Sequence, residues 1–214
     1  MRRSPTDHMK TGVRARVFVA VDIGDAVRRE AARVIGALMM KLETAKTPPK
    51  VAWVKPAALH VTIRFLGEVE PDEVERLKPL LATPIPVAPF DIAWRGIGTF
   101  PNNRHPRALW LGVIDGAAQL AAIEAEISKR IAGAAVELED RVLLPHLTLG
   151  RVKMAGAGID WPKVLQACEV RGAISHVDKV SLYQSKLSQF GPNYTELVSA
   201  PLIADHPITR SPDQ

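Results

Sequence analysis

The chain has 214 residues, 47% of them hydrophobic, so it can bury a core within one domain or two small lobes. Its formal net charge of +5 favours an anionic partner such as RNA or a nucleotide. The single cysteine, Cys168, excludes an intrachain disulfide and a thiolate zinc site, and it fits a reducing cytoplasm. The sequence shows no secretory signal and no apolar run long enough to span a bilayer, so we expect a cytoplasmic protein that is not bound to a membrane.

The apolar pattern along the chain predicts a mixed succession of strands and helices. Polar or irregular ends suggest tails at 1–13 and 201–214 around a single domain at 14–200. Residues at helical spacing predict helices at 24–45, 70–82, 115–134 and 160–168. Alternating or continuous apolar runs predict strands at 14–23, 51–54, 59–69, 90–98, 108–114, 143–152, 169–175, 177–188 and 193–199.

Two of the predicted helices have well-defined apolar stripes. The first consists of Ala31, Val34, Ile35, Leu38 and Leu42, and the third of Leu120, Ile123, Ile127 and Ile131. Each of these two helices precedes a histidine-bearing strand and follows another strand. This repeat of strand, helix and histidine-bearing strand indicates two related lobes, which a pseudo-twofold arrangement would bring together at their histidines.

The two histidine-bearing strands contain the same short pattern, His-x-Thr followed by an apolar residue. The pattern occurs in LHVTIRFLGEV at 59–69 and again in LLPHLTLGRV at 143–152. A lone histidine on a strand is usually structural, and threonine is simply a good strand former. Two of only six histidines in the same local frame, however, indicate a functional pair.

The spacing of each pattern gives both motifs the same chemistry. Because side chains alternate along a strand, His60 shares a face with Thr62, and His146 shares a face with Thr148. Two imidazoles can divide a displacement at phosphorus, one accepting the proton of water and the other protonating the departing oxygen. The threonine hydroxyls can donate hydrogen bonds to the non-bridging phosphate oxygens. The reaction needs neither a metal nor a covalent intermediate.

Other catalytic classes have less support in the sequence. A catalytic zinc usually has three protein ligands, and neither motif has a Cys, Asp or Glu nearby on the same face. There is no G-x-S-x-G stretch for a serine hydrolase, and no P-loop or G-x-G-x-x-G turn for a nucleotide cofactor. We therefore expect no cofactor and no metal.

The chain resembles the two-histidine (2H) phosphoesterase superfamily, and within it the RNA 2′,3′-cyclic phosphodiesterases, also called 2′-5′ RNA ligases. The similarity extends from about Arg16 to Leu197. It implies an α+β fold of two pseudo-symmetric lobes, each an antiparallel sheet backed by helices, around a central cleft. The residues that carry it are RVFVAVD, LHVTIRFLGEV, LWLG, LPHLTLGR and LYQSKLSQFGPNYTEL.

The resemblance assigns roles to the motif residues and to an arginine. His60 and His146 match the catalytic positions, with His60 as the acid and His146 as the base, and Thr62 and Thr148 match the substrate-binding positions. Arg151 matches an arginine that binds the phosphate or its neighbourhood. Strict alternation would turn it away from His146, so a bulge or twist at Gly150 is needed.

Several other residues are open to two interpretations. Arg64 shares the His60 face by parity, and ligand contact is as well supported as a solvated strand charge. The basic loop with Arg104, His105 and Arg107 could border the cleft, although a solvated loop is the simpler interpretation. Core packing is the simplest role for four aromatic residues, Phe18, Trp110, Tyr183 and Tyr194.

The expected function is metal-independent hydrolysis of the 2′,3′-cyclic phosphate ends of RNA or nucleotides to a 2′-phosphate, with reversible 2′-5′ ligation known in the family. One alternative is a cyclic phosphodiesterase that acts on a small nucleotide such as ADP-ribose 1″,2″-cyclic phosphate. The other is a non-catalytic RNA-binding module, although phosphate binding alone would be better served by Arg or Lys. We expect a monomer without an obligate protein partner.

Overall fold

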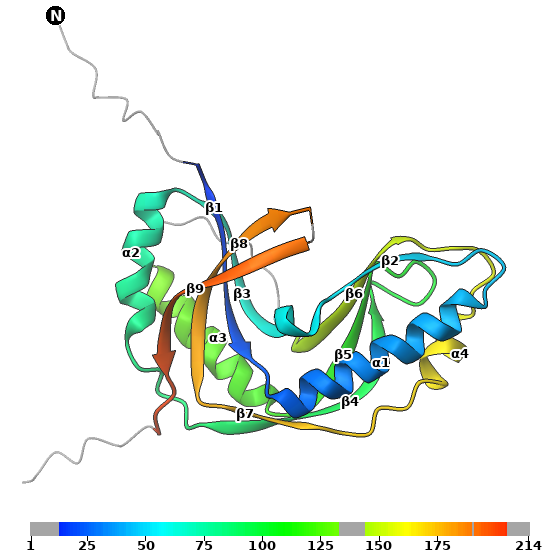
Figure 1. The fold of residues 1–214 in the computed structure, drawn as a ribbon. Helices are drawn as coiled ribbons and strands as arrows, with labels where there is room; N and C mark the ends of the chain where they lie inside the picture. The colour runs from blue at the N-terminus through cyan, green and yellow to red at the C-terminus, as the bar shows by residue number, and fades with distance from the viewer. Residues whose placement is uncertain (1–12, 133–143, 190, 205–214) are drawn as a thin grey trace, which may run out of the picture.

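The computed structural model describes residues 13–132, 144–189 and 191–204 (Figure 1). The helices are α1 (Asp25–Glu43), α2 (Pro71–Ala82), α3 (Ala117–Ile131) and α4 (Trp161–Gln166), with a short 3₁₀ turn, η1 (Pro56–Ala58). The strands are β1 (Ala15–Asp22), β2 (Lys50–Trp53), β3 (His60–Val69), β4 (Phe90–Phe100), β5 (Ala108–Asp115), β6 (His146–Met154), β7 (Ile174–Val177), β8 (Lys179–Ser188) and β9 (Gly191–Pro201).

The strands form two antiparallel sheets, which confirms the predicted α+β class with two lobes. The first sheet has the order β3-β1-β8-β9 and the second the order β2-β6-β5-β4-β7. In both sheets the histidine-bearing strand pairs with the strand that precedes its helix, β3 with β1 and β6 with β5. The repeat seen in the sequence is therefore a repeat of strand pairing, and β3 packs against β6 where the sheets adjoin.

Each sheet is covered by two helices. α2 packs on β8 and β9, and α3 packs on β3, whereas α1 packs against β7 and α4. Each lobe therefore covers its sheet with helices from both halves of the chain (Figure 1). The buried side chains of α1 and α3 include every member of their predicted apolar stripes. α1 follows a strand of the first sheet but packs against the second, and α3 follows a strand of the second sheet but packs on the first. The two lobes therefore share one hydrophobic core.

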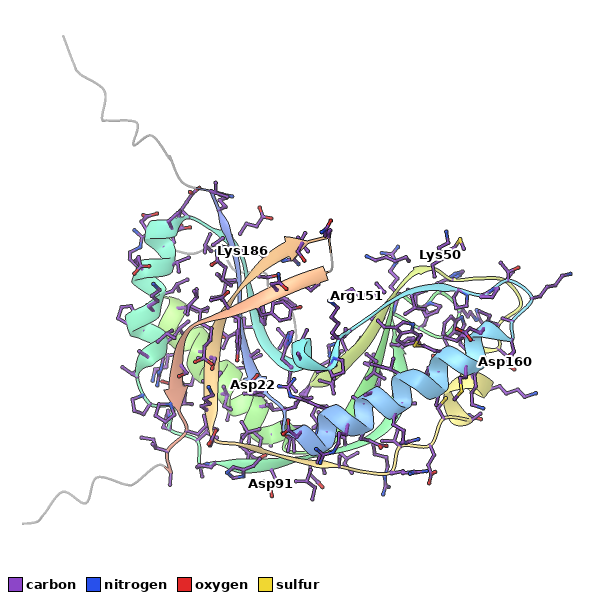
Figure 2. The ribbon with its side chains drawn as sticks, in the orientation of Figure 1. Asp22, Lys50, Asp91, Arg151, Asp160 and Lys186 are labelled. Atoms are coloured by element: carbon purple, nitrogen blue, oxygen red, sulfur yellow. The ribbon has the colours of Figure 1, made fainter. Side chains whose placement is uncertain are left out.

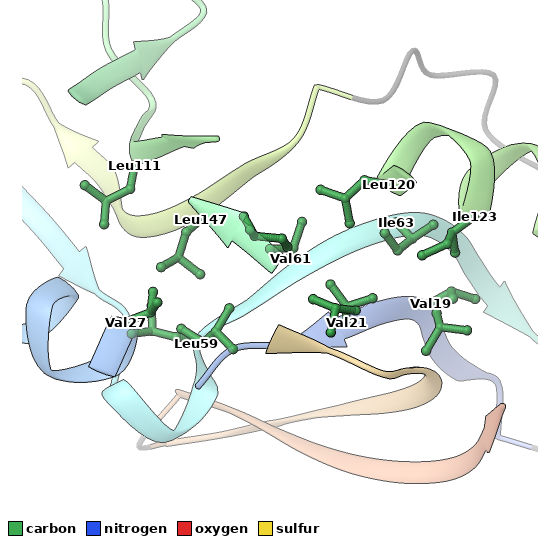
Figure 3. Packing of buried hydrophobic residues seen from close by; sticks show 14 of the residues in the cluster. Val19, Val21, Val27, Leu59, Val61, Ile63, Leu111, Leu120, Ile123 and Leu147 are labelled. Carbon is green, nitrogen blue, oxygen red and sulfur yellow. The ribbon is translucent and has the colours of Figure 1, made fainter. Parts of the chain in front are cut away.

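The core of the first sheet is built on strict alternation in β1. Val17, Val19 and Val21 are buried on the helix-covered face. Figure 3 shows Val19 and Val21 beside Val61 and Ile63 of β3 and near Leu120 and Ile123 of α3. Phe18 and Asp22 therefore lie on the opposite face. We call the face of each sheet that carries its motif histidine the motif face.

One predicted strand is displaced along the chain. The strand expected at 169–175 is found at Ile174–Val177, because only these residues pair with β4. Next to the expected start of the C-terminal tail at 201, Leu202 is 4% exposed and its N–H donates to the Asp178 carbonyl. The expected N-terminal tail at 1–13, apart from Val13, and the first residue of the strand expected at 143–152 lie outside the described residues.

No helix among the described residues is long and apolar enough to cross a membrane.

Candidate active site

The two motif histidines are held in the same way. His60 and His146 are the first residues of β3 and β6, and Nδ1 of each lies near a carbonyl oxygen two residues earlier. The distances are 2.9 Å to the Ala58 oxygen and 2.6 Å to the Leu144 oxygen. Because a carbonyl only accepts, Nδ1 must carry the proton, so each ring offers Nε2 for chemistry.

The threonine of each motif lies on the motif face, as predicted. Thr62 pairs with Ala20 of β1, and Thr148 pairs with Trp110 of β5. Both threonines are half-buried, and neither hydroxyl has a hydrogen-bond partner in the described part of the chain. Each hydroxyl can therefore donate to a ligand.

A bulge in β6 turns Arg151 toward the motif face, which confirms the need for an irregularity near Gly150. Trp110 pairs with Thr148 and Leu109 with Gly150, so Leu149 is an extra residue in β6. The extra residue restores Arg151 to the face of Thr148. Gly150 fits the bulge because a Cβ there would lie 2.8 Å from the Val51 side chain.

The same kind of bulge in β3 makes the prediction for Arg64 wrong. Val19 pairs with Arg64 and Ala20 with Thr62, so Ile63 is the extra residue and Arg64 leaves the face of His60. Its guanidinium donates to the Glu124 carboxylate and, at 2.7 Å, to the Ser128 hydroxyl, both on α3. Its side chain is 16% exposed and forms an ion pair with α3, so we do not include it in the proposed site.

Phe65 takes the position that Arg64 was expected to hold. It pairs with Phe18, and the two rings lie 6.1 Å apart. Phe65 is five residues after His60, as Arg151 is five residues after His146. The two bulged strands therefore place an aromatic ring in one lobe and an arginine in the other at corresponding positions.

Aromatic rings enclose both histidines. The Phe18 ring lies 4.8 Å from the His60 ring, and the Tyr194 ring meets His60 edge-on at 5.0 Å. Phe100 meets His146 edge-on at 5.0 Å and stacks on Trp110. These rings limit the rotation of each imidazole and exclude water from its flanks.

Core packing was too simple a prediction for these aromatic residues. Phe18 is buried but contacts a catalytic candidate, and Trp110 and Tyr194 are only half-buried. The alternation of RVFVAVD already places Phe18 on the face opposite its valines. That signal, combined with pairing to the histidine strand, could have identified Phe18 and also Asp22, which pairs with His60.

The electrostatic environment links the two motifs. Burial lowers the pKa of both His60 and His146, and the carbonyl bonds to their Nδ1 atoms oppose this effect. The positive charge of Arg151 lowers both pKa values further, and β3 contacts β6, the strand that carries Arg151. Figure 2 shows Arg151 between the β8–β9 hairpin and the edge formed by β2 and β6. The fold thus brings together His60, His146 and Arg151.

Other parts of the described surface are separate from this site. One hollow lies between α1 and β2, around Met39 and Trp53, and a second lies beside α4, around Ile97 and Cys168. Neither is lined by a motif residue. Arg104, His105 and Arg107 are exposed on the loop before β5.

The donor set for a metal can be stated only for the described residues. Among them no three His, Cys, Asp or Glu side chains gather as a candidate ligand set. Metal independence remains a prediction.

The chain is similar to known phosphoesterases. The family model for LigT-like phosphoesterases matches residues 26–110. An RNA 2′,3′-cyclic phosphodiesterase of Methanocaldococcus jannaschii is 33% identical over 184 residues, which cover 84% of this chain and 96% of the relative. One of the same name from Thermotoga maritima is 28% identical and covers 85% and 92%.

Solved structures share the fold. A protein of Thermus thermophilus has a TM-score of 0.63 at 27% identity, with 89% of this chain and all of that chain covered (100%). Apo LigT of E. coli has a TM-score of 0.63 at 23% identity and covers 89% and 99%.

Replacing Arg151 with Gln should raise the pKa of both motif histidines. The positive charge that disfavours each imidazolium is removed, so both rings gain protons at higher pH than in the parent chain. NMR titration of the imidazole carbon-bound protons measures this. Arg76→Gln, on exposed α2, is the matched control and should change neither value. A rise for only one histidine would show that Arg151 does not face both.

Proposed function

The chain belongs to the family of RNA 2′,3′-cyclic phosphodiesterases, and on this basis we propose that it opens the 2′,3′-cyclic phosphate ends of RNA or nucleotides to leave a 2′-phosphate. The observation that carries the proposal is the paired motif geometry: two imidazoles with Nε2 available, two hydroxyls without protein partners among the described residues, and an arginine whose positive charge acts on both rings. The basic net charge suits an anionic substrate.

The proposed reaction is an in-line displacement at phosphorus. His146 removes a proton from water, and the water oxygen attacks phosphorus opposite the 3′ oxygen. The bond from phosphorus to the 3′ oxygen breaks, and His60 gives its proton to that oxygen. The resulting 2′-phosphate carries the water oxygen, and the two histidines end with their protonation states exchanged.

The remaining residues stabilise the charge on phosphorus. Thr62 and Thr148 donate their hydroxyl hydrogens to the non-bridging oxygens, one from each lobe. Arg151 supplies the positive charge that matches the phosphodiester. Ligation of RNA with a 2′-5′ linkage would use the same groups in the same direction: an RNA hydroxyl would take the place of water, the bond from phosphorus to the 3′ oxygen would break, and His60 would protonate that oxygen. The monomeric state and cytoplasmic location expected from the sequence are part of this proposal.

The purified chain should open both 2′,3′-cyclic mononucleotides and RNA with a cyclic end. Phosphorus NMR of the product should show the phosphate on the 2′ oxygen, and EDTA should leave the rate unchanged because every proposed group belongs to the protein. A 3′-phosphate product would show that the 2′ oxygen, and not the 3′ oxygen, is the leaving group. Loss of activity in EDTA with recovery on added metal would contradict metal independence, and no turnover of any cyclic phosphate would favour the RNA-binding alternative.

His60→Ala and His146→Ala should each lower kcat by roughly 10² to 10⁴, the usual contribution of a general acid or base. Thr62→Val and Thr148→Val should cost less, roughly 10- to 100-fold, because each removes one hydrogen bond to a charged group. His176→Ala is the control, since His176 is exposed and pairs with Asp91. Circular dichroism should show that every variant is folded. A folded motif variant with the rate of the control would remove that residue from the mechanism.

A substrate with a 4-nitrophenolate leaving group separates the two histidines. This leaving group departs without a proton, so His60→Ala should recover much of its lost rate on it, whereas His146→Ala should remain impaired. Release of 4-nitrophenolate is followed by absorbance, and the rate of each variant is compared with its rate on the cyclic substrate. The reverse pattern would show that acid and base are exchanged.

A further inference from the structure

The two lobes differ in the residue that stands opposite each motif histidine. In the first sheet Asp22 of β1 pairs with His60, and in the second sheet Gly112 of β5 pairs with His146. Paired residues of an antiparallel ladder point to the same face with their Cβ atoms about 5 Å apart. The corresponding position therefore holds a carboxylate beside one histidine and no side chain beside the other.

The Asp22 carboxylate is held in place by two neighbours. The Tyr183 hydroxyl donates to its Oδ2 at 2.9 Å, and Arg28 Nη2 lies 3.8 Å from its Oδ1. Burial and the charge of Asp22 raise the pKa of Tyr183, so this phenol remains a donor at all working pH values. Figure 2 shows Asp22 at the end of β1 that leads into α1.

Arg28 connects this carboxylate to the turn that orients His60. Its Nη1 donates to the carbonyl oxygens of Pro56, at 2.7 Å, and Leu59, at 3.2 Å. These residues flank Ala58, whose carbonyl accepts from His60 Nδ1. The side chains around Asp22 thus position the His60 ring as well as its charged neighbour.

The second lobe has no room for such a carboxylate. A Cβ at Gly112 would lie 2.9 Å from the Arg95 carbonyl oxygen and 3.2 Å from the Trp110 ring. The charged group found to act on His146 is Arg151, which acts on His60 as well. The asymmetry therefore rests on Asp22.

We propose that Asp22 is a positioning residue whose carboxylate, beside His60 in the ladder, favours the protonated form of this histidine and so makes it the general acid. This inference rests on the proposed function for the chemistry, but its electrostatic part stands on the resting protein. It explains how two lobes with the same motif divide one reaction into an acid side and a base side.

The other charged side chains that act on the two histidines favour the neutral rings. Burial lowers the pKa of both rings; at His60, Asp22 opposes it, while Arg151 and Arg28 add to it. Tyr194 and Phe18 meet His60 as rings, and Phe100 and Trp110 meet His146 as rings. A bound phosphodiester adds its negative charge beside both histidines. Among the described side chains, Asp22 is then the carboxylate that favours the protonated form of His60 and not that of His146.

The first test uses the protein without substrate. NMR titration of Asp22→Asn should show the pKa of His60 lowered by about 0.5 to 1 unit, while that of His146 stays unchanged. Asp91→Asn is the matched control: it removes a carboxylate beside another histidine, on β4 and β7, and should move neither motif histidine (Figure 2). An unchanged His60, or an equal change in both motif histidines, would overturn the proposal. This readout does not require turnover, so it is independent of the proposed function.

The second test is the pH profile of kcat/KM on a cyclic mononucleotide. Asp22→Asn should move the alkaline limb, where His60 loses its proton, to lower pH by about the same 0.5 to 1 unit and leave the acid limb in place. On the 4-nitrophenolate substrate the variant should match the parent, because no acid is needed. A uniform loss at every pH would indicate a structural role only and overturn the proposal, as would movement of the acid limb.

A second variant guards against misfolding. Tyr183→Phe keeps the Asp22 charge but frees it from its hydrogen bond, so the His60 pKa should fall in the same direction by a smaller amount. If His60 titrates unchanged in folded Tyr183→Phe and in folded Asp22→Asn, the proposal fails.

Discussion

The hydrogen bond from each motif histidine to a carbonyl two residues earlier is the contact on which the proposed chemistry depends. It places the proton on Nδ1 and leaves Nε2 for the substrate. It is possible because both histidines begin their strands. The carbonyls of Ala58 and Leu144 lie before the ladder, where no strand partner claims them. Moving either histidine further into its strand would cost this orientation.

The second constraint is the bulge that follows each motif, and it marks the limit of prediction from alternation. Strict parity identified the shared faces of His60 with Thr62 and of His146 with Thr148. It failed at Arg64, because the extra Ile63 reverses the faces beyond it. Near Gly150 the need for a bulge followed from the family resemblance, which implies that Arg151 binds the phosphate, whereas the resemblance assigns no role to Arg64. A bulge depends on the partner strand, so the sequence of one strand does not reveal it.

The helices show the same division between local and distant information. The apolar stripes of α1 and α3 were predictable to the residue, since helical spacing alone determines them. Which sheet each stripe covers was not predictable, because burial of an apolar face is favourable against any apolar surface and does not specify the partner. Likewise β7 is a strand only where β4 offers a partner, and the preceding residues, including Gly172 with φ of 72°, do not pair. Pairing and packing partners thus account for most of what the sequence left undetermined.

A repeated scaffold raises the question of how two equal halves perform unequal work. The differences lie at corresponding positions: Asp22 against Gly112 beside the histidines, and Phe65 against Arg151 after the bulges. A phosphodiester carries one negative charge, which one arginine matches, and a second guanidinium in place of Phe65 would lower the pKa of the ring that must stay protonated. An aromatic ring there adds no charge. In the proposed mechanism the pseudo-symmetry therefore supplies the paired geometry, and the residues that differ between the lobes set the direction of proton transfer.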